Sequence, residues 1–331
     1  MLKKEVIIGY FFVIILVVGI GVSLYYASRF AQFDFSNIDI WEKPKTIREY
    51  FIYNNETELE EHNVTNIIVI GNTNGGSFSI VWTEYNMTNK IWEIVVECEE
   101  PSDYIVSYNF HNGAVQIELK SDFAAFTVYF NNNYNYSWSA NVTSDMGSIS
   151  MSGKNVNIEN IYANISMGSF SGNFVKCNIS YIFVATALGS IALNVDESTV
   201  NDLSLLTDMG SISLDLENMY TPNETELFSN TGSISIDLNL VNAFNNSRLN
   251  AETDSGSISF DINLVENATC KIEAETKGSI DYDTRDFIVI QPGGNKVILQ
   301  TPDFEDSNGL MVTLKSSNGS ISIRCSRGDY T

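Results

Sequence analysis

Four aspartates occupy the same place in a repeated phrase, and their type and spacing suit a specific chemistry. The phrase reads DMGSISM at 145–151, DMGSISL at 208–214 and DSGSISF at 254–260. Five residues after the glycine, in what the sequence presents as four consecutive repeats, stand Asp215, Asp237, Asp261 and Asp283. Carboxylates stacked one repeat apart repel one another, and Ca²⁺, which takes about six to eight oxygen ligands, would relieve that repulsion.

Two interpretations of this acidic row remain open. In the first, the carboxylates hold Ca²⁺ together with the hydroxyls of Ser213, Ser235 and Ser259. In the second, the row is solvated and its charge serves solubility. The second is favoured, because the glycine pairs of calcium-binding β-rolls are missing and carboxylates one repeat apart offer few ligands per ion. No other cofactor is expected.

Other reactive side chains are sparse. His62 and His111 stand far apart, and the sequence holds no Cys-x-x-Cys pair, no glycine-rich phosphate loop and no serine elbow. We therefore expect no catalysis. The RGD tripeptide at 327–329 matches an integrin-binding signal, which we interpret here as a chance occurrence. Arg324 and Arg327 are instead expected to protect the last open strand edge from pairing with another molecule.

The elements that must position these groups follow from the repeat. Its glycines are spaced by 21 to 24 residues, with a last step of 41 that we interpret as two periods, and they are Gly147, Gly168, Gly189, Gly210, Gly232, Gly256, Gly278 and Gly319. On both sides of the glycine, apolar and polar residues alternate, which is the period of a strand with one buried face. Two short strands per coil, stacked about 4.8 Å apart, predict an all-β fold, a β-solenoid with coils of about 21 residues.

The same stacking bears on the cysteines. Cys177 and Cys270 fall in coils four apart, and Cys270 and Cys325 in coils three apart. Both separations exceed the roughly 7 Å between Cα atoms that a disulfide allows. We therefore expect mostly free, partly buried thiols, including Cys98.

Three stretches carry a resemblance to a known family. They are VTNIIVIGNTNGGSFSIV (64–81), FTVYF (126–130) and WSANVTSDMGSISM (138–151) with its copies. They resemble the putative-adhesin β-solenoid family, also called toastrack domains, over about residues 64–324. The resemblance implies a surface-exposed role in interaction or structure, and it brings no catalytic residues with it.

The first thirty residues differ from the rest. Residues 6–27 run without a charge, and as a helix they are long enough to span a hydrocarbon core of about 30 Å. Lys3 and Lys4 precede the run and an acidic stretch follows it, so the positive-inside rule predicts a cytoplasmic N-terminus and an extracellular remainder. A cleaved signal peptide is the alternative, disfavoured by the length of the run and the lack of a clear small-x-small cleavage site.

These signals divide the chain into a cytoplasmic stub with a transmembrane anchor (1–28), a linker with a first strand (29–63), the β-solenoid ectodomain (64–324, with regular coils over 125–324) and a C-terminal tail (325–331). A net charge of −23 without a basic stripe excludes nucleic acid as a partner. Asn-x-Ser/Thr sequons fit an extracellular location, and the candidate glycosylation sites are Asn141, Asn164, Asn223, Asn245 and Asn267.

The sequence thus predicts a single-pass membrane protein whose ectodomain acts in cell-surface adhesion or envelope structure. Its expected partners are other surface proteins or glycans. The alternative is a ligand-binding sensory or accessory ectodomain that works with a separate membrane partner. A hydrolase built on the solenoid is disfavoured, because coils of about 21 residues leave little room for a substrate groove.

Overall fold

A computed structural model describes residues 46–331, apart from 84–86, 221, 241–245, 266, 305–308 and 329–331. Within them the regular structure is almost all strand, beside the helix α2 (Glu56–Glu61) and a 3₁₀ turn at Pro101–Asp103. The all-β expectation is confirmed. The anchor expected at 6–27 lies outside the described residues. In the part of the chain that is described, no helix is long and apolar enough to cross a membrane.

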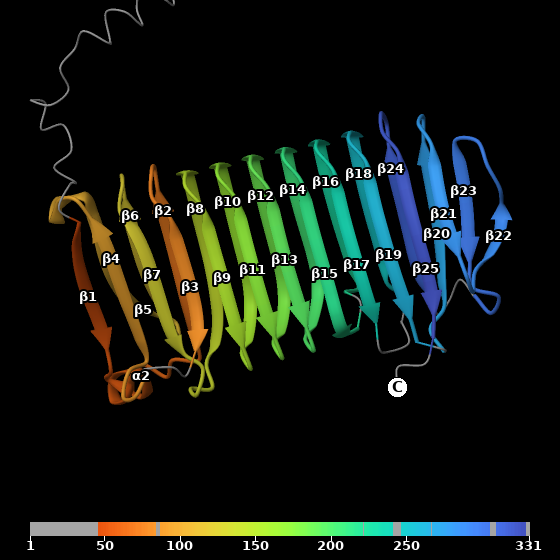
Figure 1. The fold of residues 1–331 in the computed structure, drawn as a ribbon. Coiled ribbons are helices and arrows are strands. Elements are labelled where there is room, and N and C mark those ends of the chain that lie inside the picture. The colour runs from red at the N-terminus through yellow and green to blue at the C-terminus, as the bar shows by residue number, and fades with distance from the viewer. Residues whose placement is uncertain are drawn as a thin grey trace, which may run out of the picture. The chain divides into compact units, whose positions relative to one another are not determined.

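The described strands form two sheets (Figure 1). Sheet A has 12 strands, in the spatial order β1 (Ile47–Tyr53), β4 (Trp92–Cys98), β7 (Ala125–Asn131), β3 (Phe78–Thr83), β9 (Ile149–Lys154), β11 (Phe170–Val175), β13 (Ile191–Asp196), β15 (Ile212–Met219), β17 (Ile234–Leu240), β19 (Ile258–Leu264), β25 (Ile321–Arg327) and β21 (Ile280–Thr284). Sheet B has 13 strands, in the order β22 (Ile288–Gln291), β23 (Lys296–Gln300), β20 (Cys270–Thr276), β24 (Leu310–Ser316), β18 (Arg248–Ser255), β16 (Glu224–Thr231), β14 (Thr199–Met209), β12 (Asn178–Leu188), β10 (Asn157–Met167), β8 (Ser137–Met146), β2 (Asn66–Thr73), β6 (Ala114–Ser121) and β5 (Tyr104–His111).

The middle of the stack follows the repeat. From β8 to β19 each coil gives one strand to sheet B and the next to sheet A, and every coil pairs in parallel with the following one. Equivalent residues fall opposite each other, as Ile212 does with Ile191 and Ile234. Sequence order and spatial order therefore agree over residues 137–264.

The glycine of each repeat lies at the corner between the two strands. Gly210 has φ +157°, and a Cβ built there would overlap the carbonyl oxygen of Gly189 in the neighbouring coil. The same relation links Gly232 to Gly210 and Gly256 to Gly232, so successive corners stack backbone on backbone. We call this column of stacked glycines the glycine spine. A hydroxyl three residues before the glycine donates to these carbonyls, as Thr207 Oγ1 does to Gly189 O at 3.0 Å. Glycine is required here for close approach as well as for its backbone angle.

The C-terminal end corrects the expected coil order. β24 and β25 do not follow β20 and β21; they lie between that coil and the coil of β18 and β19. The step of 41 residues is therefore not two stacked coils. Residues 288–300 form the antiparallel β22–β23 hairpin on the outer side of β20, and the chain then returns to fill the inner position. β21, not β25, is the sheet A edge, so Arg324 and Arg327 do not lie on an edge strand.

The N-terminal end is built in a related way. The coil of β6 and β7 lies outside the coil of β2 and β3, although it follows it in sequence. Antiparallel strands then cover it, with β4 and β1 on sheet A and β5 on sheet B. β1, the first strand expected in the segment 29–63, and α2 thus belong to the compact unit that begins at Thr46. Such covering strands protect open parallel edges.

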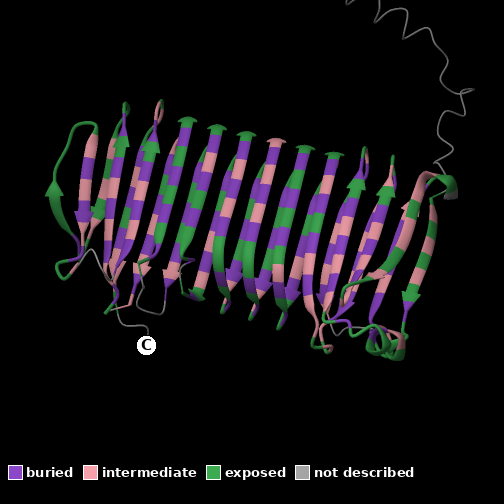
Figure 2. Ribbon diagram, turned by 180° about the vertical axis from the view of Figure 1, so that it is seen from behind, coloured by how far each residue is buried: buried purple, intermediate pink, exposed green. Residues whose placement is uncertain are grey.

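One hydrophobic core runs between the two sheets. Along most strands buried residues alternate with half-buried or exposed ones, as the coloured bands of Figure 2 show. The N-terminal coils fill the core with large rings such as Trp82 and Phe130, and the coils of β15 and β17 use aliphatic side chains such as Leu216 and Leu238. Burying one such side chain stabilises the fold by about 1.5–3 kcal/mol.

Candidate binding surfaces

The acidic row lies on the outer face of sheet A, but its order differs from that of the sequence. Asp215 pairs with Asp237, and Asp237 pairs with Asp261. The next partner of Asp261 is Arg324, which in turn pairs with Asp283. The expectation of four consecutive aspartates is therefore wrong, because β25 places a cation between the third and the fourth.

Arg324 gives this row its own counter-charge. Its Nη1 lies 3.7 Å from Asp261 Oδ2, and it lines a shallow pocket of about 280 Å³ together with Asp283 and Arg285. Among the described residues, no group of three or more His, Cys, Asp or Glu side chains is placed to hold a metal ion. The calcium interpretation stays a prediction, and Arg324 competes with it.

The surroundings of two carboxylates in the row, Asp215 and Asp237, disfavour the charged form. Burial raises the pKa of the Asp215 carboxyl, and the charges of Glu217, Asp237 and Asp196 raise it further. Burial also raises the pKa of Asp237, with Asp261 as the second cause. A raised carboxyl pKa means that part of the row is under electrostatic strain at neutral pH.

Serine hydroxyls run beside the acidic row in a straight column. The residues three positions after each corner face outward on sheet A and pair rung to rung; in spatial order they are Ser79, Ser150, Ser171, Ala192, Ser213, Ser235, Ser259 and Ser322. We call this set the serine column. Apart from Ala192, it presents the same small donor and acceptor about every 4.8 Å.

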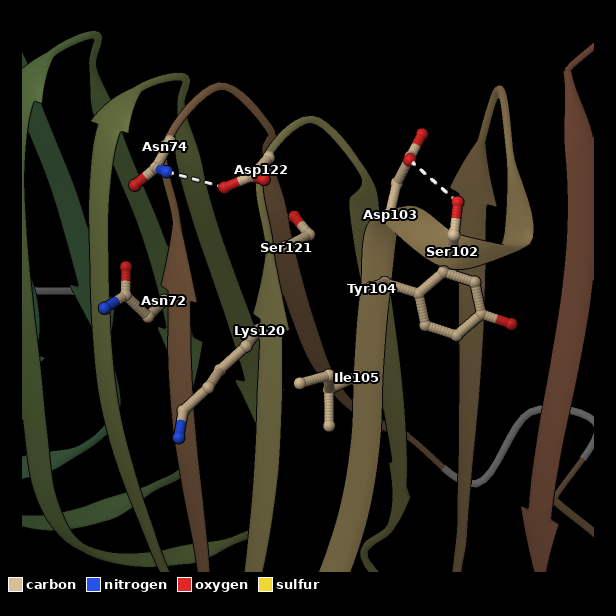
Figure 3. Close-up of a pocket in the computed structure, with 9 residues that line it drawn as sticks. All are labelled: Asn72, Asn74, Ser102, Asp103, Tyr104, Ile105, Lys120, Ser121 and Asp122. Atoms are coloured by element: carbon tan, nitrogen blue, oxygen red, sulfur yellow. Dashed lines mark hydrogen bonds between the residues drawn. The ribbon is translucent and has the colours of Figure 1, made fainter.

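A polar pocket lies at the N-terminal end of sheet B, where sequence reasoning pointed to no site. It measures about 290 Å³ and is lined by Asn72, Asn74, Ser102, Asp103, Tyr104, Ile105, Lys120, Ser121 and Asp122. Figure 3 shows Asn74 and Asp122 pointing toward each other across the strand tips, and Asn74 Nδ2 donates to Asp122 Oδ1 at 2.7 Å. Amide, carboxylate and ammonium groups together can bind the hydroxyls of a small polar ligand.

The candidate glycosylation sites are distributed over several elements. Asn141 and Asn164 face outward from β8 and β10 on sheet B, and both are exposed. Asn223 precedes β16 and Asn267 precedes β20, and these are exposed as well. Asn245 lies outside the described residues.

The histidines contact different neighbours. The His62 ring stacks on Phe110 with centroids 4.3 Å apart, whereas His111 Nε2 lies 2.9 Å from Asn112 Nδ2. Both histidines are exposed.

The arginine of the RGD tripeptide is engaged within the chain. The Arg327 guanidinium donates to both carboxylate oxygens of Asp303, at 3.2 and 2.9 Å. Its backbone N–H donates to Asp286 Oδ2 at 3.2 Å. Asp329 lies outside the described residues. These bonds compete with any partner for the arginine.

All four cysteines are free and buried. Because β25 lies beside β21, Cys270 and Cys325 belong to adjacent coils and not to coils three apart, which corrects the sequence-based spacing. Burial raises the pKa of the Cys325 thiol to about 12, and it raises the pKa of Cys270 well above the ordinary value. Buried, protonated thiols are poor nucleophiles.

Comparisons with known proteins give two structural neighbours. No family model and no curated protein matches the chain. A solved structure described as a putative cell adhesion protein from Clostridium sporogenes shares 13% identity with a TM-score of 0.34, over 85% of this chain and 100% of its own. Another, described as a putative adhesin from Bacteroides fragilis, shares 10% identity with a TM-score of 0.40, over 85% of this chain and 97% of its own. Both descriptions agree with the adhesin resemblance of the sequence, but at these scores neither transfers a ligand or a partner.

Proposed function

We propose that the chain is a membrane-anchored extracellular β-solenoid that acts in cell-surface adhesion or envelope structure, without catalysis. The observation that carries this proposal is the serine column on the outer face of sheet A, with the acidic row beside it. A face that repeats one chemical group at nearly every coil suits a partner that is itself repetitive, such as a surface glycan or an ordered envelope protein. Many weak identical contacts on such a partner add to a strong one.

A binding assay that compares the native chain with variants carrying long side chains on this face tests its role. Beads coated with the full chain are mixed with cell envelopes from the organism of origin, and retention is measured. Ser213→Arg with Ser235→Arg inserts two long cations into the serine column, and we expect retention to fall at least about fivefold. The control is Ser180→Arg, an exposed serine of β12 on the other sheet. Equal retention by the double variant and the native chain would rule out this face.

The anchor is a separate part of the proposal and has its own test. If residues 6–27 span the membrane, alkaline extraction leaves the full chain with the membrane pellet, whereas it releases a peripheral protein. A chain released into the supernatant would contradict the anchor without bearing on the serine column.

The polar pocket at the end of sheet B favours the second function, a ligand-binding sensory or accessory ectodomain. Its volume of about 290 Å³ suits a ligand about the size of a monosaccharide. Titration of the full chain with a panel of neutral and acidic sugars, followed by calorimetry, tests this function. Binding that Asp122→Ala abolishes supports it, and no heat for any sugar in the panel counts against it.

A further inference from the structure

The outer face of sheet B carries apolar side chains where the repeat otherwise places polar ones. We define the sheet B patch as Tyr162, Phe183, Ala185, Leu206 and Phe228, which lie on the consecutive strands β10, β12, β14 and β16. Tyr162 pairs with Phe183, and their rings stack with centroids 4.9 Å apart at 8°. Ala185 pairs with Leu206, and Leu206 with Phe228, so the patch crosses four coils without a break.

A second apolar feature follows the corner of nearly the same coils. Immediately before the corner glycines stand Met146, Met167, Leu188 and Met209, paired rung to rung, and we call them the corner ridge. Their exposed fractions are 46%, 44%, 40% and 53%. The next two positions of this column are Thr231 and Ser255. The apolar residues are thus confined to consecutive coils and are not a requirement of the corner.

The charges on the strands that carry these residues have one sign, and the adjacent strand β18 pairs its Arg248 with Glu224 at the border. The strands β8, β10, β12, β14 and β16, all of them described, contain no Lys or Arg. They contain six carboxylates: Asp145, Glu159, Asp202, Asp208, Glu224 and Glu226. Apart from Glu159 these side chains are exposed. Of the patch, Tyr162 is exposed and the other four side chains are half-buried, whereas the whole corner ridge is exposed. An accessible apolar surface with a polar rim indicates an interaction site, and a rim of one charge sign selects a partner of opposite charge.

We propose that the sheet B patch and the corner ridge bind a basic amphipathic helix of a partner protein, with apolar side chains flanked by Lys and Arg. The spacing fits such a helix. The ridge residues repeat about every 4.8 Å, and the apolar positions of a helix at i, i+3/i+4 and i+7 advance by about 5 Å each. Methionine side chains adapt to varied apolar partners. This surface lies on the opposite sheet from the serine column, so its test is independent of that one.

The patch has two other candidate occupants, and the charge pattern weighs against the first. A second copy of this chain would bring its own carboxylates and a net charge of −23 to the same face. A glycan on Asn164 is the other competitor, because Asn164 pairs with Ala185 and would cover the patch.

The test uses the full chain and two designed peptides of about 18 residues, one of Leu and Lys and one of Leu and Glu, each with a single apolar helical face and a photo-crosslinking group. We expect the Lys peptide to bind and to crosslink to β10–β16. The double variant Met167→Thr with Met209→Thr replaces two ridge residues by the residue type that stands at Thr231 in the same column, and it should weaken binding at least about tenfold. Phe123→Ser, which changes a side chain 69% exposed outside both features, is the matched control and should leave affinity unchanged.

The rim is tested by neutral replacements. The double variant Asp202→Asn with Asp208→Asn should lower the affinity for the Lys peptide about threefold or more and reduce the salt dependence of its binding. Four results would overturn the proposal: equal binding of the Glu peptide, crosslinks outside β10–β16, a native chain that carries sugar on Asn164, or self-association that Met167→Thr with Met209→Thr abolishes.

Discussion

The middle coils, residues 137–264, and the C-terminal end, residues 270–327, are built from the same repeat, yet the chain runs through them differently. In the middle, each coil packs on the one that precedes it in sequence. At the end, the last coil lies between two earlier ones. Even so, the glycine spine passes from Gly256 through Gly319 to Gly278 without interruption. The repeat therefore specifies the shape of a coil and its register, but not its position in the stack.

The two regions also differ in the interactions that stabilise them. The middle coils are bonded on both sides by parallel neighbours and lie over a continuous core. The middle has the exposed ion pair Lys176–Glu197, and the end has more: Glu273 lies 2.9 Å from Lys271 Nζ and 3.3 Å from Lys296 Nζ, and Arg327 binds Asp303. The carboxyl pKa values shift in opposite directions. In the middle, the pKa values of Asp215 and Asp237 are raised, whereas at the end hydrogen bonds from Lys271 lower the pKa of Glu273.

The largest expected effect comes from a methyl group on the glycine spine. Gly210→Ala would place a Cβ on the carbonyl of Gly189, so two coils must separate or the corner must change its conformation. We expect a loss of more than about 4 kcal/mol in the free energy of unfolding, or no folded protein. Chemical denaturation followed by circular dichroism measures it.

The matched control lies at the C-terminal end. Gly293 also has positive φ, at +82°, but a Cβ there would meet nothing within 4 Å. Gly293→Ala should cost only the backbone term, about 1 kcal/mol. Equal losses for the two alanines would mean that the backbone angle, and not the close approach of neighbouring corners, makes glycine necessary.

The comparison also shows how far sequence alone could go. Alternation around Gly210 and Gly232 predicts both strands, their inward faces and the corner, and the structure confirms the all-β fold with two parallel-rich sheets. It could not predict that β24 and β25 insert before β20. Every coil offers the same backbone edge, so the repeat does not specify the order; the β22–β23 hairpin, which carries no copy of the repeat, occupies the outer edge of β20 in its place.

The surface was predictable to a lesser extent. Arg324 stands five residues after Gly319, so its place in the acidic column could be read from the repeat, but its neighbours could not. The sheet B patch had a signal that was missed: Phe183 and Phe228 are apolar at outward positions. The polar pocket of Figure 3 had none, because it forms where β5 and the irregular N-terminal coils meet.

A cavity of the same size in each region would sharpen the comparison. Leu238 in β17 and Leu299 in β23 are both fully buried. Leu238→Ala should lower the free energy of global unfolding by about 2–5 kcal/mol, since it weakens the centre of the stack. Leu299→Ala should loosen mainly the terminal hairpin, because covering elements open locally before the whole unfolds.

Amide hydrogen exchange distinguishes the two outcomes. For Leu299→Ala we expect faster exchange confined to β20, β22 and β23, with the global transition shifted by less than half as much as for Leu238→Ala. A uniform increase over all strands would show that the end and the middle unfold as one unit.

A charge reversal at the junction of the two regions should have a smaller effect. Arg324→Asp puts a carboxylate between Asp261 and Asp283, and each such pair at about 4.8 Å repels by about 0.9 kcal/mol in water. We expect a loss of about 1–2 kcal/mol that shrinks in high salt. Arg285→Asp, on the same pocket but outside the row, is the control. Melting curves with and without chelator complete the test, and a native chain that loses several degrees on chelation would revive the calcium interpretation.

The smallest effect tests the opposite pKa shifts directly, through Asp237→Asn in the middle and Glu273→Gln at the end. The raised pKa of Asp237 means that the folded state binds more protons than the unfolded state, so stability rises as pH falls toward 4. Asn removes that strain, and Asp237→Asn should gain up to about 0.5 kcal/mol at pH 7 and nothing near pH 4. The lowered pKa of Glu273 has the reverse sign: its stabilisation is present above the unfolded pKa and is lost on acidification. Glu273→Gln should therefore lose about 0.5–1 kcal/mol at pH 7, and the loss should vanish near pH 4. Chemical denaturation of both variants at pH 7 and near pH 4 tests both predictions. Changes of equal sign at pH 7 would contradict the electrostatic contrast between the two regions.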